Sequence, residues 1–171
     1  MCSCEHVQMC KFTYLHIYPF PHFLHSFTGM KPLNLILLVD DDDTTNYVNH
    51  RTLQRTQAAR EVKIFTDGEQ ALHYLQAAAC DPGDPGTEIC PDLIFPDIKM
   101  PVMDGFEFLE AYKQMGLDRM MPTKIMMLTS SASFYDLKRL ETFAEVKRHF
   151  SKPLADHDIK EIFREYFPEH V

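Results

Sequence analysis

From Leu33 onward, short apolar runs alternate with stretches in which apolar residues recur every three or four positions. The short runs predict strands, and the stretches between them predict helices. Strands and helices that alternate in this way are typical of a parallel sheet with helices on both faces. We therefore expect a doubly wound α/β fold with five strands, at residues 35–39, 62–65, 93–95, 125–128 and 147–150.

Three helices have the clearest apolar stripes, because their apolar residues fall on one helical face. The stripes are Ala71, Leu72, Leu75 and Ala78; Phe108, Leu109, Tyr112 and Met115; and Ile159, Ile162, Phe163 and Tyr166. The connection at 79–91 contains Asp-Pro-Gly-Asp-Pro-Gly, which predicts successive turns in a surface loop.

Two further helices are predicted from weaker signals. One follows Thr44, and its expected apolar contacts are Tyr47, Val48 and Leu53. The other begins near Ser133, because Asp136 follows three residues later in the pattern of a capping box. The sum is five β/α units.

Composition supports one soluble globular domain. The chain has 171 residues, of which 45% are hydrophobic and 25% charged. Its net charge of -8 argues against binding to nucleic acid or to anionic membranes. No apolar run approaches the roughly 18 residues of a membrane span. The five cysteines form no regular disulfide framework, which favours the cytoplasm.

Residues 1–30 differ from the rest of the chain. They contain three cysteines and four histidines, but the spacing matches no zinc pattern of paired ligands. We expect a disordered extension, or one that arises from an upstream start codon, and a folded domain at 31–171.

Chemically active side chains follow four of the five predicted strands. They are Asp40 to Asp43 after the first strand, Asp97 after the third, Thr129 and Ser130 after the fourth, and Lys152 after the fifth. Such groups converge at the carboxyl edge of a parallel sheet. Converging carboxylates need a cation, and their hard oxygens select Mg²⁺ or a similar ion such as Mn²⁺. Asp42 and Asp43 also have a simpler interpretation, as residues that cap and charge the first helix.

This arrangement favours phosphoryl chemistry. Asp40, Asp41 and Asp97 could provide carboxylate oxygens to the ion, together with a backbone carbonyl just after Asp97. Lys152 would add an ammonium and Thr129 a hydroxyl, so that the oxygens of a phosphoryl group transferred to Asp97 could all be neutralised.

Four sequence blocks, at 37–41, 97–105, 127–130 and 150–153, resemble the receiver domains of two-component response regulators. The most specific block is Asp-Ile-Lys-Met-Pro-Val-Met-Asp-Gly. The resemblance implies a flavodoxin-like sheet with strand order 2-1-3-4-5. It also implies that Asp97 is the phosphoacceptor, that Asp40, Asp41 and the backbone carbonyl of Lys99 bind the metal, that Thr129 is the switch hydroxyl, and that Lys152 contacts the phosphoryl group.

The resemblance implies a cytoplasmic signalling protein, not an enzyme beyond its own phosphorylation and dephosphorylation. We expect it to act as a stand-alone protein, because nothing beyond the last predicted helix is long enough to make an output domain. Its phosphodonor would be a phosphohistidine on a sensor histidine kinase or a histidine phosphotransfer protein. The output would be an altered contact with a downstream protein, made around the fourth helix, fifth strand and fifth helix. The protein would be a monomer or a phosphorylation-dependent dimer.

Three residues near the predicted site, Pro96, Lys99 and His149, could change how a receiver domain with these motifs behaves. Pro96 precedes Asp97 in the central strand, where the missing N–H predicts a lost hydrogen bond, an early strand end or a bulge, and a displaced Asp97. Lys99 could change the lifetime of the phosphorylated state. His149 takes the position of a switch aromatic ring and could make the output surface sensitive to pH.

Two alternatives remain open at the level of sequence. The first is a degenerate receiver that binds partners without phosphorylation, because Pro96 distorts the site. The second is a phosphatase of the haloacid dehalogenase type, since Asp41, Asp43 and Thr45 match the nucleophile motif of that superfamily. The absence of an obvious cap insertion, and of a further acidic pair after Lys152, argues against the second.

Overall fold

A computed structural model describes residues 30–79, 89–130 and 133–171. Its centre is a parallel five-stranded sheet with strand order β2-β1-β3-β4-β5, as predicted. The strands are β1 (Leu33–Val39), β2 (Ala59–Phe65), β3 (Leu93–Pro96), β4 (Lys124–Thr129) and β5 (Val146–Ser151). Their order places β3 at the centre of the sheet, between β1 and β4.

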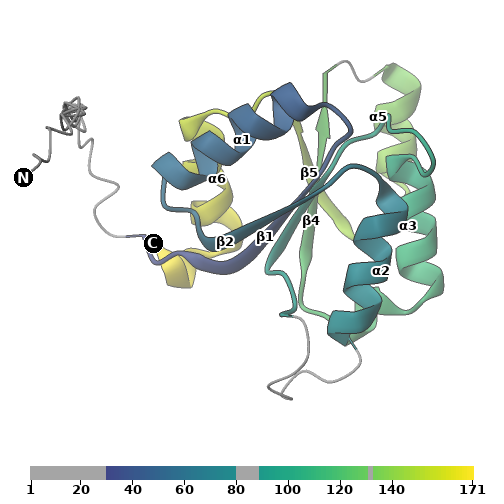
Figure 1. Ribbon diagram of the computed structural model, residues 1–171, viewed down its shortest axis with the longest axis horizontal. Helices are drawn as coiled ribbons and strands as arrows, with labels where there is room; N and C mark the ends of the chain where they lie inside the picture. The colour runs from purple at the N-terminus through teal and green to yellow at the C-terminus, as the bar shows by residue number, and fades with distance from the viewer. Residues whose placement is uncertain (1–29, 80–88, 131–132) are drawn as a thin grey trace, which may run out of the picture.

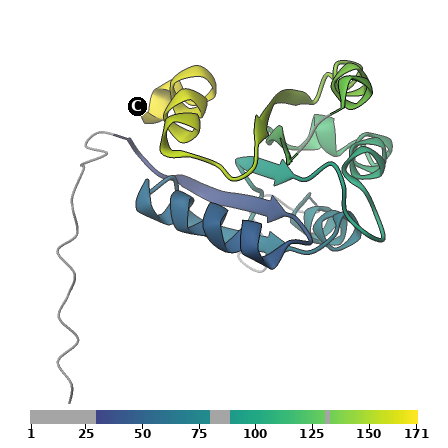
Figure 2. The same ribbon diagram turned by 90° about the horizontal axis from the view of Figure 1, so that it is seen from above.

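Helices cover both faces of the sheet (Figures 1 and 2). They are α1 (Asp43–Arg55), α2 (Gly68–Ala79), α3 (Gly105–Gln114), α4 (Leu117–Met120), α5 (Phe134–Leu140) and α6 (Asp156–Tyr166), followed by the short η1 (Pro168–His170). Helices α1 and α6 lie on one face, and α2, α3 and α5 lie on the other. In the described ranges, no helix has the length and apolar content that crossing a membrane requires.

Successive side chains of β1 point to opposite faces of the sheet, so that β1 contributes to one apolar core on each face. Leu35, Leu37 and Val39 pack with α2 and α3. Ile36 and Leu38 pack with α1 and α6 in the second core. Burial on both faces explains why β1 is a continuous apolar run instead of an alternating one.

The inner face of α1 is more polar than we predicted. Tyr47 is 63% exposed and does not contact the core, so that prediction was wrong. Leu53 is buried as expected, but its buried neighbours on the helix are Asn46, Asn49 and Thr52. The hydropathy pattern missed Asn46 and Asn49 because each is held by a hydrogen bond to a tertiary partner that the sequence does not display.

The stripe of α3 ends earlier than predicted. Met115 is the C-cap residue and is 41% exposed, whereas Phe108, Leu109 and Tyr112 are buried as expected. The helix therefore ends one residue before the last position of the predicted stripe.

Helix starts follow the local signals closely. The Asp42 carboxylate accepts hydrogen bonds from the amides of Thr44 and Thr45, at 2.8 and 3.2 Å, and so caps α1. Ser133 and Asp136 form the predicted capping box at the start of α5. These caps satisfy amides that have no partner inside the helix.

Pro96 interrupts the hydrogen bonding between β3 and β4, as predicted. Amides at successive residues point to alternate neighbours, since Asp97 donates to the Val39 carbonyl and Ile98 donates to the Leu128 carbonyl. An amide at position 96 would therefore face β4, and proline has none. The strand β3 ends at Pro96, which agrees with the prediction of an early end.

Asp97 nevertheless keeps its place in the sheet. The β3–β4 ladder pairs Leu93 with Lys124, and beyond the gap Asp97 pairs with Leu128 in the same register. The Asp97 amide donates to Val39 at 2.8 Å. The predicted displacement of Asp97 is therefore wrong, because its bond to β1 holds the register.

Two sequence predictions fall partly or wholly outside the described residues. These are the expectation of a disordered extension at 1–30 and the turn-rich loop at 79–91.

Candidate functional site

Adjacent strand ends bring Asp40 and Asp97 together. The Asp40 amide donates to the carbonyl of Phe65 in β2, and the Asp97 amide donates to the carbonyl of Val39 in β1. Both residues therefore continue the ladders at the carboxyl edge of the sheet. Asp40 is 1% exposed and Asp97 is 6% exposed.

Lys152 lies between the two buried carboxylates. Its Nζ is 2.6 Å from Oδ2 of Asp40 and 2.7 Å from Oδ2 of Asp97. The other oxygens bond to nearby amides, since Oδ1 of Asp40 accepts from Asp42 at 3.0 Å and Oδ1 of Asp97 accepts from Ile98 at 2.7 Å. One ammonium thus bridges the tips of β1 and β3.

Asp41 completes a cluster of three carboxylates. One oxygen from each of Asp40, Asp41 and Asp97 lies within 4.8 Å of the other two. If all three are ionised, the single charge of Lys152 leaves a net charge of about -2 in a largely buried site. Oδ2 of Asp40 is buried and lies 2.6 Å from Nζ of Lys152, so a divalent ion would share these carboxylates with that ammonium. The residues present therefore fit a hard divalent ion such as Mg²⁺ or Mn²⁺.

The pKa values of Asp97 and Lys152 are both raised, and in each case burial and the neighbouring opposite charges have opposing effects. Burial raises the pKa of Asp97 above its usual range; contact with Lys152 works against this, and repulsion from Asp40 adds to it. Burial alone would lower the pKa of Lys152, but its contacts with the two carboxylates outweigh burial and raise it. Lys152 therefore stays charged at neutral pH, and Asp97 is the carboxyl whose ionisation is resisted.

The other predicted site residues surround this cluster. Thr129 is buried at the end of β4, and its carbonyl accepts the Lys152 amide at 3.0 Å. Lys99 is exposed, two residues beyond Asp97. His149 is exposed on β5, where it pairs with Met127 of β4. The roles of Thr129, Lys99 and His149 remain predictions.

Asn46 supports the site and was missed by the sequence reasoning. Its amide Nδ2 donates to the backbone carbonyl of Asp40 at 2.6 Å. Asn49, one turn later, accepts the amide of Leu154 at 2.8 Å, just beyond Lys152. The spacing of Asn46, Asn49 and Leu53 on one helical face was the signal that could have identified them.

Gly105 permits the start of α3 to approach the site closely. A Cβ atom at Gly105 would lie 2.2 Å from the backbone oxygen of Asp97 and 2.8 Å from the Met127 side chain. Only glycine fits this approach. The role of Gly105 at this contact is therefore steric.

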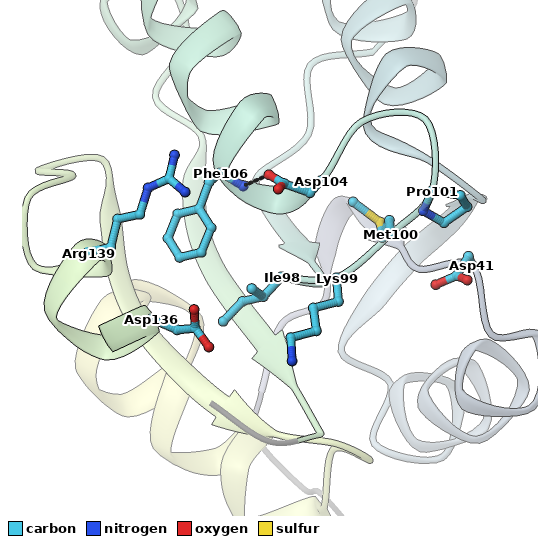
Figure 3. A pocket seen from close by; sticks show the side chains of 9 residues that line it. All are labelled: Asp41, Ile98, Lys99, Met100, Pro101, Asp104, Phe106, Asp136 and Arg139. Carbon is cyan, nitrogen blue, oxygen red and sulfur yellow. Dashed lines mark hydrogen bonds between the residues drawn. The ribbon is translucent and has the colours of Figure 1, made fainter. Parts of the chain in front are cut away.

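A pocket of about 480 Å³ opens beside the cluster (Figure 3). It lies between α5 and the loop that follows β3, and Asp41 and Lys99 are on its wall. Its other lining residues are Ile98, Met100, Pro101, Asp104, Phe106, Asp136 and Arg139. The acidic cluster is therefore accessible from this side.

Comparisons with known proteins agree with the architecture. The family model described as "Response regulator receiver domain" matches residues 36–164. The "Probable methanogenesis regulatory protein FilR2" of Methanothrix harundinacea is 28% identical over 131 residues, which cover 77% of this chain and 79% of that protein. The "Hybrid signal transduction histidine kinase L" of Dictyostelium discoideum is 28% identical over 137 residues, which cover 80% of this chain and 7% of that kinase.

A solved structure gives the same result for the fold. The crystal structure of a two-component response regulator from Cytophaga hutchinsonii has a TM-score of 0.69 and 25% sequence identity, and the match covers 79% of this chain and 97% of that chain. The haloacid dehalogenase alternative finds no support, because Asp43 lies in the first turn of α1 and is not one of the three clustered carboxylates. The chain belongs to the response regulator receiver domain family of two-component signalling.

Proposed function

We propose that this receiver accepts a phosphoryl group on Asp97 from a phosphohistidine donor, in a reaction that depends on Mg²⁺ or Mn²⁺. The observation that carries the proposal is the meeting of Asp40, Asp41, Asp97 and Lys152 at the tips of separate strands. Receiver domains typically bind Mg²⁺ at an acidic cluster of this kind, which supports the choice of ion.

Each residue has a distinct part in the proposed transfer. Asp40, Asp41 and the backbone carbonyl of Lys99 would hold the ion with Asp97, and the bound ion would neutralise phosphoryl oxygens. An oxygen of Asp97 attacks phosphorus, so that an O–P bond forms while the P–N bond to the donor imidazole breaks. The Lys152 ammonium, already 2.7 Å from Asp97, then contacts an oxygen of the transferred group.

Thr129 would couple phosphorylation of Asp97 to a change at the protein surface. Its hydroxyl moves toward the phosphoryl group and changes the surface around α5, β5 and α6. The exposed ring of His149 on β5 would respond to that movement. In this proposal the protein acts in the cytoplasm, as a monomer or a phosphorylation-dependent dimer.

Receiver domains interact with histidine kinases or phosphotransfer proteins. We propose a partner of that type as the phosphodonor, and the similarity to part of a hybrid histidine kinase supports this choice. Neither nucleic acid nor a membrane is a proposed partner, in keeping with the net charge of -8.

One observation favours a second candidate, a receiver that binds partners without being phosphorylated. Pro96 removes a ladder hydrogen bond directly before Asp97, so the acceptor is held from β1 more firmly than from β4. A less constrained acceptor could fail to align with the donor.

Incubation with acetyl phosphate and Mg²⁺ separates these functions. The phosphoryl switch requires a mass gain of one phosphoryl group that disappears in Asp97→Asn and when the divalent cation is chelated. Asp43→Asn is the matched control, because Asp43 is also acidic but lies on α1 outside the cluster. No mass gain in a chain with an intact circular dichroism spectrum refutes the phosphoryl switch and supports the constitutive binding module.

A further inference from the structure

The strand β2 has an open edge. It is an outermost strand of the sheet, and among the described residues it pairs only with β1 (Figure 1). The carbonyl of Phe65 accepts the Asp40 amide, so this carbonyl points to β1. Because the backbone groups of a strand alternate between its two sides, the amides and carbonyls of Val62 and Ile64 point to the open edge. Such an edge is a template for a further strand.

The side chains of β2 are different on the two faces of the strand. Val62 packs against the core that α1 and α6 cover, and Ile64 on the same face is 42% exposed. Glu61 and Lys63 lie on the other face, where Oε1 and Nζ are 3.9 Å apart and the side chains are 48% and 30% exposed. The Lys63 ammonium also lies over the Tyr74 ring of α2, 4.4 Å from its centroid. One face of the edge therefore presents an acid and a base, two residues apart.

We propose that this edge pairs with the β2 edge of a second copy of the chain, in an antiparallel ladder centred on Val62. Each Val62 exchanges hydrogen bonds with the Val62 of the other copy, and each Ile64 amide donates to an Arg60 carbonyl. On both sides of the centre, Glu61 lies opposite Lys63 of the other copy. These two positions have no backbone hydrogen bonds between them, so their side chains are the closest across the ladder.

Charge selects this register over its neighbours. If the centre moves by one residue, Glu61 lies opposite a second Glu61, or Lys63 lies opposite a second Lys63, and like charges directly opposite are destabilising. Of the three registers, only the one centred on Val62 pairs unlike charges on both sides. It also places the exposed Ile64 opposite Arg60, whose methylene groups can cover it.

The other edge strand, β5, lacks this complementarity. It contains Lys147 and Arg148 but no acidic residue, so a self-paired β5 has no cross-strand pair of unlike charge. The net charge of -8 on each copy opposes association in general. We therefore expect a weak dimer that depends on the local pairs at β2. It needs no phosphodonor, so this inference goes beyond the proposed function.

Sedimentation equilibrium of the full-length protein without a phosphodonor tests the pairing. A concentration series that reaches about 1 mM should show an equilibrium between monomer and dimer. Glu61→Lys and Lys63→Glu should each raise the dissociation constant at least about tenfold, because both cross-strand pairs then have like charges. An equimolar mixture of the two variants should associate about as tightly as the wild type, and so should the double variant, since unlike charges are restored at both positions.

Two controls separate the pairing from the effect of net charge. Glu61→Lys replaces an acid by a base, which changes the net charge from -8 to -6 and would by itself favour association. Glu141→Lys makes the same change at the exposed C-cap of α5, and it should not weaken the dimer. Thermal unfolding checks the fold of each variant. If Lys63→Glu is unstable because it loses its contact with Tyr74, Glu61→Lys and the double variant decide the result.

Several results would overturn the inference. These are a monomer at every concentration, association that requires acetyl phosphate, species larger than a dimer, an unchanged dissociation constant in Glu61→Lys, or a mixture of the two variants that does not associate. The outcome is distinguishable from that of the phosphoryl switch. A missing dimer leaves the phosphorylation of Asp97 untouched, and a chain that is not phosphorylated can still form the dimer.

Discussion

Replacement of Asp97 by asparagine should have opposite effects on stability in chelator and in Mg²⁺. Oxygens of the buried pair Asp40 and Asp97 lie within 4.8 Å of each other, which corresponds to a repulsion of about 3.5 kcal/mol at an effective dielectric constant of about 20. Burial and this repulsion raise the pKa of Asp97, so ionisation destabilises the folded state as the pH rises above the unfolded-state value. At neutral pH without metal, Asp97→Asn should therefore be more stable than the wild type.

Divalent metal should reverse that order. An ion that binds only the folded state adds about 1.4 kcal/mol for each tenfold rise in concentration above its dissociation constant. For a chain of this size, that gain raises the melting temperature by about 3 to 6 °C per tenfold step. The wild type should show this slope, and Asp97→Asn should lose most of it.

Thermal unfolding at several Mg²⁺ concentrations, with a chelator as the zero point, measures both effects. Asp43→Asn is the control for non-specific ion binding, because it removes an equal charge from the first turn of α1. If the melting temperatures of the wild type and Asp97→Asn rise equally with Mg²⁺ concentration, the reasoning is refuted, because the ion then binds elsewhere.

Three further predictions concern the surroundings of Asp97. Gly105→Ala should lower the free energy of unfolding by about 3 kcal/mol or more, because its Cβ would lie 2.2 Å from the Asp97 oxygen; urea titration measures the loss, and an unchanged midpoint would contradict it. Pro96→Val supplies an amide that faces the Met126 carbonyl, so it should raise the free energy of unfolding by about 0.5 to 1.5 kcal/mol. Chemical denaturation measures this change, and an unchanged free energy of unfolding would contradict it. Lys99→Asn should change the half-life of phosphorylated Asp97, and identical decay in the two proteins would count against a role for Lys99.

Most of the architecture could be predicted because it depends on short-range patterns. The run 35–39 is apolar at every position, and β1 is buried on both faces as that pattern predicts. Asp42 and Ser133 start their helices through bonds to amides only two or three residues away. The carboxyl edge of a parallel sheet then brings the strand ends together without further information.

The details that escaped prediction depend on contacts between distant segments. Asn49 is buried because it bonds to Leu154, 105 residues away in sequence. Tyr47 has the hydropathy of a core residue, but it lies on the outer face of α1. Gly105 is required by the backbone of Asp97, which packs against it from the preceding strand. Of these three residues, only Asn49 has a local signal, which is its spacing with Asn46 and Leu53 on one helical face.

The same long-range contacts explain why Pro96 leaves the geometry of the site intact. Asp40 is fixed by the carbonyl of Phe65 and by Asn46, and neither contact involves the β3–β4 ladder. On the other side of the cluster, the Lys152 amide bonds to Thr129, and Asn49 holds the residues that follow it. Two residues on the inner face of α1 thus secure both the acidic and the basic partner of the acceptor. The site is therefore organised from α1, β1 and β4, so a hydrogen bond lost at β3 weakens the sheet locally without separating the charges that meet around Asp97.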